Sequence, residues 1–152
     1  MPANNSPERS NPGKGNGLAG LFPTAFVTGA STGLGRAFAE MLLAGGVRVW
    51  GTARDRSRLA PLAAHPGFTG IELDLQDGAA AEKTFTEASR SASGFALVIN
   101  NAGYGVFGDF VATDFSVWQG QMEAMLVNTA RLSHAALREM RGRRILGELR
   151  DG

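Results

Sequence analysis

The 152-residue sequence contains no cysteine, one tyrosine and two lysines. The absence of cysteine excludes disulfides, thiolate metal ligands, iron–sulfur clusters and cysteine nucleophiles. The histidines, His65 and His134, have no partners at the spacing of a metal-binding or nucleophilic motif, so we expect no metal site. The tyrosine is Tyr104 and the lysines are Lys14 and Lys83, and these positions limit the chemistry that the chain supports.

Long apolar runs and an excess of one charge are also absent. No apolar stretch approaches the ~20 residues of a membrane-spanning helix, and residues 1–17 lack the apolar core of a signal peptide. The 15 basic and 14 acidic residues leave a formal net charge of +1, which gives no electrostatic footprint for nucleic acid or an anionic membrane. We therefore expect a cytoplasmic protein without nucleic-acid or membrane partners.

Short apolar runs alternate with helical patterns after a polar segment, residues 1–20, that we expect to be a disordered tail. The expected strands are 25–28, 47–52, 71–74 and 96–100, and the expected helices are 34–44, 56–64, 79–91 and a long one from Asp114 or Ser116 to about Met140. In the first helix Leu34, Phe38, Met41 and Leu42 have the spacing of one buried face.

This alternation indicates parallel βαβ units, and continuously apolar strands are typical of a sheet that is covered on both faces. Since βαβ crossovers are right-handed, the order 3-2-1-4 places two helices on each face. The sequence therefore predicts an α/β fold, a Rossmann-like doubly wound parallel sheet of about four strands, in one domain over residues 21–152.

A glycine-rich turn, T-G-A-S-T-G-L-G, occupies residues 28–35 between the first strand and the first helix. Glycines let the backbone N–H groups approach a phosphate, and the helix N-terminus adds about half a positive charge. The hydroxyls of Ser31 and Thr32 are further donors. The spacing differs from G-x-G-x-x-G, and no lysine follows as it would in a Walker loop. A purely structural turn is the alternative.

Four motifs together resemble the short-chain dehydrogenase/reductase family. They are the turn at residues 28–35, Asp74-Leu75 after the third strand, N-N-A-G at residues 100–103 after the fourth, and V-N-T-A around Asn128 in the long helix. The resemblance covers residues 24–140 and implies a domain that binds a nicotinamide dinucleotide. The residues that it implies for cofactor binding are Gly29, Ser31, Thr32, Gly33, Leu34, Gly35, Arg54, Asp74, Leu75, Asn101, Ala102 and Gly103.

Simpler roles exist for three of these polar residues. The simpler role for Asp74 is to cap a turn through its carboxylate, and for Asn128 it is to face solvent in the long helix. Asn101 has the alternative of tying loops to the sheet, a structural role that the resemblance also implies.

The choice of nicotinamide cofactor depends on the end of the second strand. In the family an acidic residue that selects NAD stands at the position of Ala53, and an arginine directly after it favours NADP. Arg54 fits this role because a guanidinium pairs with a phosphate in bidentate fashion. Asp55 is the competing residue, since a shift of register would bring its carboxylate to the ribose 2′-OH. We favour NADP(H) over NAD(H).

The catalytic set that the resemblance implies is a serine and Tyr-x-x-x-Lys, with an asparagine at the position of Asn128. The lysine lowers the tyrosine pKa from ~10 so that the phenol exchanges a proton near neutral pH. Tyr104 is followed four positions later by Gly108, and no serine follows Ser133. We therefore expect a cofactor-binding half that is inactive alone, with Asn128 as the remnant of the catalytic set.

Residues 141–146 have the pattern of an approach to a fifth strand, but residues 147–152 do not continue this pattern. A truncation or a change of reading frame would explain the break. The alternatives are a non-catalytic nucleotide-binding or dimerisation partner of a full-length relative, and a non-functional product. The resemblance implies that the helix at residues 115–140 packs in a homo- or hetero-oligomer. Its apolar side chains for such an interface are Val117, Met122, Met125, Leu126, Leu132 and Leu137.

Overall fold

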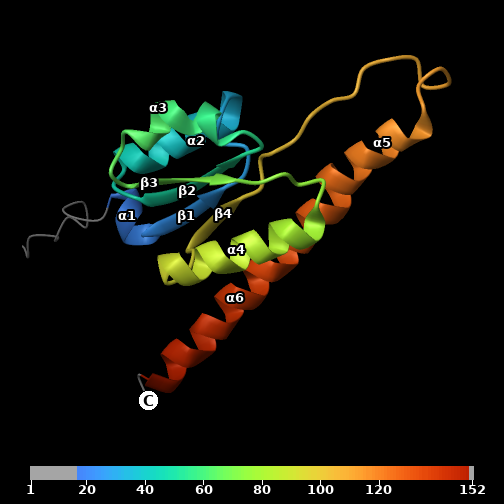
Figure 1. Cartoon of the computed structure of the whole chain (residues 1–152). Coiled ribbons are helices and arrows are strands. Elements are labelled where there is room, and N and C mark those ends of the chain that lie inside the picture. The colour runs from blue at the N-terminus through green and yellow to red at the C-terminus, as the bar shows by residue number, and fades with distance from the viewer. Residues whose placement is uncertain (1–16, 151–152) are drawn as a thin grey trace, which may run out of the picture.

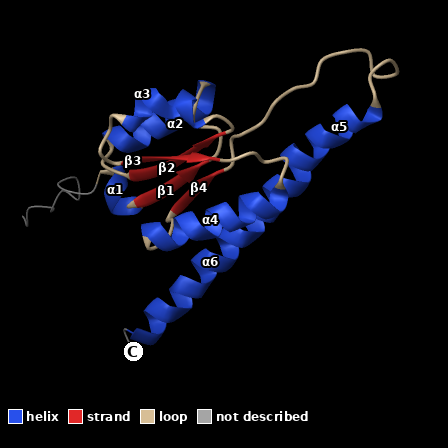
Figure 2. Ribbon diagram, viewed as in Figure 1, coloured by secondary structure: helices blue, strands red, loops and turns tan. Residues whose placement is uncertain are grey.

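The computed structural model describes the backbone of residues 17–150 and the side chains of residues 17–142. A four-stranded parallel sheet lies between two layers of helices (Figures 1 and 2). The strands are β1 (Thr24–Val27), β2 (Arg48–Ala53), β3 (Phe68–Glu72) and β4 (Leu97–Ile99). They lie in the order β3-β2-β1-β4, and all three pairings are parallel. The predicted α/β fold and strand order are thus confirmed.

Helices cover both faces of the sheet, as right-handed crossovers require. One face carries α2 (Gly33–Ala44), the 3₁₀ turn η1 (Arg56–Leu59) and α3 (Ala60–Ala63). The opposite face carries α4 (Gly78–Ala92) and α6 (Asn128–Arg150) (Figure 1). The sheet is therefore shielded on both sides, which explains why every residue of β1 is buried.

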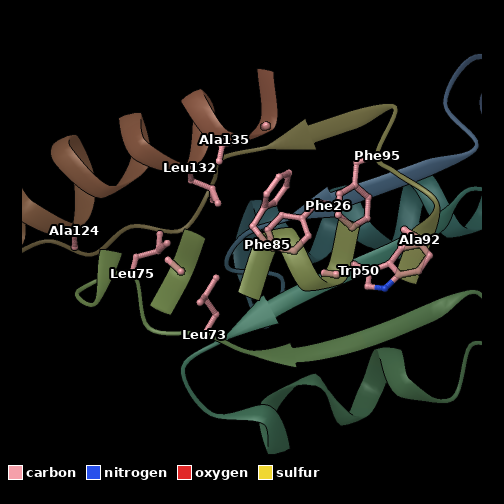
Figure 3. Close-up of a cluster of buried hydrophobic side chains, with 13 residues drawn as sticks. Phe26, Trp50, Leu73, Leu75, Phe85, Ala92, Phe95, Ala124, Leu132 and Ala135 are labelled. Atoms are coloured by element: carbon pink, nitrogen blue, oxygen red, sulfur yellow. The ribbon is translucent and has the colours of Figure 1, made fainter. Parts of the chain in front are cut away.

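The core on the α4 and α6 side is aromatic. Successive side chains of a strand point to opposite faces, and Phe26 and Trp50 point to this side, where Phe85 of α4 and Phe95 join them (Figure 3). The ring centroids of these contacts lie 5.1–5.6 Å apart, in tilted or edge-on arrangements. Leu132 is 1% exposed and anchors α6 on this cluster, so it is not available for the interface that we expected it to serve.

The buried face of α2 differs from the expected one. Leu34 and Met41 are exposed, whereas Gly35, Ala39 and Leu42 are buried together with Leu43. This stripe still has the helical spacing, but two of its members are small. A pattern based on large apolar side chains overlooks glycine and alanine, which allow the helix to approach the sheet closely.

The long helix begins where the sequence predicts, because the Asp114 carboxylate accepts a hydrogen bond from the Ser116 N–H at 2.8 Å. It consists of α5 (Phe115–Met122), a π-helical turn η2 (Glu123–Val127) and α6. Together they form a rod that extends past the sheet (Figure 1). The approach to a fifth strand expected at residues 141–146 is wrong: α6 continues to Arg150, through a segment whose arginines and leucines are good helix formers.

The ordered domain begins before residue 21. Residues 18–20, which we expected in the tail, belong to the short helix α1 (Leu18–Leu21), and the Ala19 N–H donates to the Gly45 carbonyl at 3.2 Å. Contact of Leu18 with Gly45 and the core explains this order. The rest of the expected tail, residues 1–16, lies outside the described residues. In the described part of the chain no helix has both the length and the hydropathy to cross a membrane.

Candidate functional site

The glycine-rich turn leaves β1 at the carboxyl edge of the sheet and leads into α2. Gly29 and Gly33 have φ values of +69° and +56°, which glycine adopts without steric cost. The Gly29 N–H donates to the Thr52 hydroxyl at 3.3 Å. Thr32 precedes α2, and its side chain makes no capping hydrogen bond. The first N–H groups of α2 therefore have neither an intrahelical acceptor nor this cap, as an anion-binding helix N-terminus requires.

Two glycines of this turn allow close backbone packing. A Cβ on Gly29 would lie 2.8 Å from the Ala102 Cα, and a Cβ on Gly35 would overlap the Gly29 carbonyl oxygen and the Asn101 side-chain nitrogen. Gly33 meets nothing within 4 Å. The absence of a side chain at Gly29 and Gly35 thus lets the turn pack against the segment after β4. At Gly33 glycine is favoured instead because of the positive φ.

The segment after β4 is fixed to the turn by Thr28 and Asn101. The Thr28 hydroxyl oxygen accepts hydrogen bonds from the N–H groups of Asn101 and Ala102 at 2.9 and 3.0 Å. The Asn101 side-chain amide donates to the carbonyls of Thr28 and Gly29 at 3.1 and 3.3 Å. The Asn101 side chain thus has the structural role that the resemblance implies.

The end of β2 presents two opposite charges with different surroundings. The Asp55 carboxylate accepts hydrogen bonds from the Ser57 hydroxyl at 2.6 Å and the Ser57 N–H at 2.8 Å. These bonds, together with the charge of Arg58, hold the pKa of Asp55 below its usual value. The Arg54 guanidinium lies over the ring of Tyr104, 5.7 Å from its centroid. The two side chains therefore have separate partners.

The loop after β3 is held by the long helix. The Asp74 carboxylate accepts a hydrogen bond from the Gln76 N–H at 3.0 Å, so it caps its own turn. Asn128 is 5% exposed, and its amide donates to the carbonyls of Leu75 and Gln76 at 2.8 and 3.3 Å. A Cβ on Gly78 would overlap the Asn128 side chain. The solvent-facing alternative for Asn128 is thus wrong.

These segments surround a cavity of about 520 Å³, a size typical of small-molecule sites. It lies where the strand order reverses, between β1 and β4, the usual ligand position in an open parallel sheet. The predicted residues that line it are Gly29, Ser31, Thr32, Arg54, Asp74, Leu75, Asn101, Ala102 and Gly103. Gly33, Leu34, Gly35 and Asn128 are not among the lining residues, and Leu34 is exposed.

The lining also includes residues outside the predicted cofactor-binding set. They are Ala53, Arg58, Leu73, Tyr104, Ala124 and Met125, and the competing residue Asp55 also contributes. The sequence placed Met125 among interface residues, because an apolar residue in a helix does not reveal which neighbour it faces. Of these residues, Tyr104 is the one that the sequence indicates, because it directly follows the N-N-A-G motif.

The cavity suits an anionic dinucleotide rather than a metal ion. A cradle of backbone at Gly29, an uncapped helix N-terminus and two arginines suit phosphate groups. The lining also contains apolar residues and one aromatic residue, Leu73, Leu75, Met125 and Tyr104, which suit a base. Within the described residues no group of three or more histidines, cysteines and carboxylates is placed to hold a metal.

Comparisons with known proteins agree with this site. A family model described as short chain dehydrogenase matches residues 23–148. The chain is 33% identical over 124 residues to an uncharacterised oxidoreductase of Schizosaccharomyces pombe, a match that covers 82% of this chain and 42% of that protein. The chain spans about half the length of the curated relatives it matches.

Two solved structures have the same architecture. A short-chain dehydrogenase from Streptomyces avermitilis is 34% identical with a TM-score of 0.73, and the match covers 79% of this chain and 45% of that one. A metagenomic short-chain oxidoreductase in complex with NADP is 30% identical with a TM-score of 0.72, over 77% of this chain and 56% of that one. With a family model that matches most of its length and a cavity at the position that the motifs predict, the chain belongs to the short-chain dehydrogenase/reductase family.

Proposed function

We propose that the cavity binds NADP(H) and that the chain is the cofactor-binding part of an oxidoreductase acting on a carbonyl or alcohol. The observation that carries the proposal is the convergence of four separate segments on one cavity: the turn after β1, the end of β2, the loop after β3 and the segment after β4. The relative that was solved with NADP supports this choice of ligand. The bound nicotinamide would supply or accept the hydride.

Each segment has its own task in this proposal. The N-terminus of α2, with Ser31 and Thr32, holds the pyrophosphate. Asp74 and Leu75 hold the adenine, and the segment 101–103 holds a ribose. Gly33, Leu34 and Gly35 contribute through their backbone, as the first residues of α2.

Arg54 is the residue that we propose for the 2′-phosphate. Arg54 lines the cavity, and Arg58 adds a second positive charge to the lining. The Asp55 carboxylate accepts two hydrogen bonds from Ser57 at one oxygen, Oδ1, and so serves as the cap of η1. These contacts support NADP(H) over NAD(H).

We further propose that these 152 residues bind the cofactor without turning it over. The serine and Tyr-x-x-x-Lys that the family resemblance implies do not occur at matching positions in the sequence. The catalytic role expected for Asn128 stays a prediction. Within this chain its side chain holds the Leu75–Gln76 loop beside the cavity. The expected cytoplasmic location is likewise still a prediction.

Titration of the purified chain with NADPH and NADH tests the proposal. We expect saturable binding that is tighter for NADPH, followed by nucleotide fluorescence, because the 2′-phosphate adds a charge-assisted contact. We expect no consumption of NADPH at 340 nm with a panel of aldehydes and ketones. Failure to bind either nucleotide would contradict the proposed function, and turnover would contradict the proposed inactivity.

We also propose that the helix at residues 115–140 pairs with another copy of this chain or with a full-length relative. Leu126 and Leu137 are 68% and 65% exposed, and their spacing of eleven residues is about three helical turns, so they share one face. Unpartnered apolar surface on one helix face is typical of an association site.

Glutamate at both positions tests the pairing. We expect L126E/L137E to be monomeric in size-exclusion chromatography with light scattering, while the wild-type chain is a dimer, because a buried charge disfavours the interface. The matched control is Met41→Glu, which changes an exposed apolar residue of α2 and should stay dimeric. A monomeric wild type would contradict pairing between copies of this chain, and an aggregated one would favour the non-functional alternative.

A further inference from the structure

Tyr104 is the aromatic residue of the cavity lining, and the side chain over its ring is Arg54. We propose that Tyr104 is a positioning residue that orients Arg54 toward the 2′-phosphate and so increases the preference for NADP(H). This inference rests on the proposed function. It adds a residue that acts through Arg54 rather than through its own contact with the phosphate.

The geometry of the contact leaves the arginine ready to bind. A guanidinium that lies over an aromatic face, within about 6 Å of the centroid, is attracted by the ring. Its N–H groups lie in the guanidinium plane and remain available for a bidentate pair with phosphate. Within the described part of the chain Arg54 makes neither a hydrogen bond nor an ion pair. The ring contact is therefore what restricts this side chain.

Tyr104 is itself held on two sides. The Gln121 side-chain amide of α5 donates to the Tyr104 carbonyl at 3.0 Å, and the Gln76 side-chain amide donates to the Tyr104 hydroxyl at 2.8 Å. The ring is half-buried and packs against the aromatic core cluster. A ring fixed in this way is a platform whose position is set before the cofactor arrives, so less side-chain freedom is lost when Arg54 binds.

The neighbouring charges do not replace this contact. The Asp55 carboxylate accepts its hydrogen bonds from Ser57 rather than from Arg54. Arg58 also lines the cavity, but the arginine over the Tyr104 ring is Arg54. Loss of the ring should therefore affect the group that recognises the 2′-phosphate and leave the rest of the cavity in place.

The test compares Tyr104→Leu, which removes the ring, with Tyr104→Phe, which keeps the ring and loses the bond from Gln76. Dissociation constants for NADPH, NADH, adenosine 2′,5′-bisphosphate and AMP are measured by calorimetry on the full chain. We expect Y104L to weaken binding of the two 2′-phosphorylated ligands about three- to tenfold, with NADH and AMP unchanged. Y104F should retain most of the selectivity, because its ring, the packing of that ring and the bond from Gln121 remain.

Two controls separate positioning from general damage. Phe107→Leu makes the same kind of change on the same loop, at a side chain that is 94% exposed and outside the lining, and should change nothing. In an Arg54→Ala background Y104L should have no further effect on NADPH binding, because the two residues act through one contact. Thermal unfolding of each variant verifies that it is folded.

A second readout uses the fact that Tyr104 is the single tyrosine of the chain. Incorporated fluorotyrosine gives one ¹⁹F resonance, which should shift on addition of adenosine 2′,5′-bisphosphate and stay in place when Arg54 is alanine. An unshifted resonance in the wild type, with the ligand bound, would overturn the inference.

The binding outcomes are distinct from a failure of the proposed function. If the wild-type chain binds neither nucleotide, the proposed function is wrong and this inference with it. If the wild type prefers NADPH and Y104L keeps that preference, or loses NADPH and NADH equally, the inference alone is overturned. Tighter NADPH binding by Y104L would also overturn it, because the ring would then block Arg54 rather than orient it.

Discussion

Replacing Gly35 with alanine should destabilise the domain and abolish nucleotide binding. The added Cβ would overlap the Gly29 carbonyl oxygen and the Asn101 side-chain nitrogen, so the turn or the segment after β4 must move. Overpacking at such a site costs about 1–3 kcal/mol, a large share of a typical stability of about 5–15 kcal/mol. Urea unfolding monitored by tryptophan fluorescence measures the loss of stability, since Trp50 is buried in the core.

Two other glycines serve as matched controls. Gly33→Ala places a Cβ in open space but at a φ of +56°, so its cost is about 1 kcal/mol from the backbone alone. Gly142→Ala also meets open space, within α6, and should stabilise the chain by up to about 1 kcal/mol. Equal stabilities for the Gly35 and Gly142 variants would show that the turn is not tightly packed.

Replacing Arg54 with alanine should remove the preference for NADPH. A hydrogen-bonded contact with a charged group contributes about 1.5–3 kcal/mol, so NADPH binding should weaken about 10- to 100-fold. NADH has no 2′-phosphate, so its binding should change little. Fluorescence titration at fixed ionic strength gives the dissociation constants for NADPH and NADH, and the ratio of the two tests the prediction.

Arg56 offers the control for charge. Arg56→Ala removes the same charge two residues further on, at an exposed residue that does not line the cavity. If Arg54 acts only by general electrostatic attraction, both variants should weaken NADPH binding equally. If it makes a specific contact, only Arg54→Ala should weaken NADPH binding. Equal weakening of NADPH and NADH by Arg54→Ala would contradict the assignment of the 2′-phosphate to this side chain.

The sequence was sufficient to predict the fold because the pattern of the chain is periodic. Alternation of strand and helix signals determines a parallel sheet, and crossover handedness then limits the strand order. A local cap was also predictable: Asp114, one of the two expected starts of the long helix, accepts the Ser116 N–H. A structural role for Asn101 was also expected, and its side chain ties the segment after β4 to Thr28 and Gly29.

Contacts between distant side chains were less predictable. The stacking of Arg54 on Tyr104 depends on where two loops lie in space, and neither residue has a local pattern that indicates the other. The sequence also does not reveal which face of the long helix packs on the domain. Met125 was therefore assigned to an interface, although it lines the cavity. The continuation of α6 was missed because a family pattern was given more weight than the helix propensity of the residues themselves.

The parallel pairing of all the strands has a consequence for the order of folding. No strand can pair with its neighbour through a short hairpin, so each pairing must close a long loop, and such topologies fold slowly. The contact between Thr28 and Asn101 joins residues 73 positions apart. We expect this docking of β4 to be a late event. Because the same docking completes the cavity, a nucleotide that binds there would trap the finished sheet and slow its unfolding.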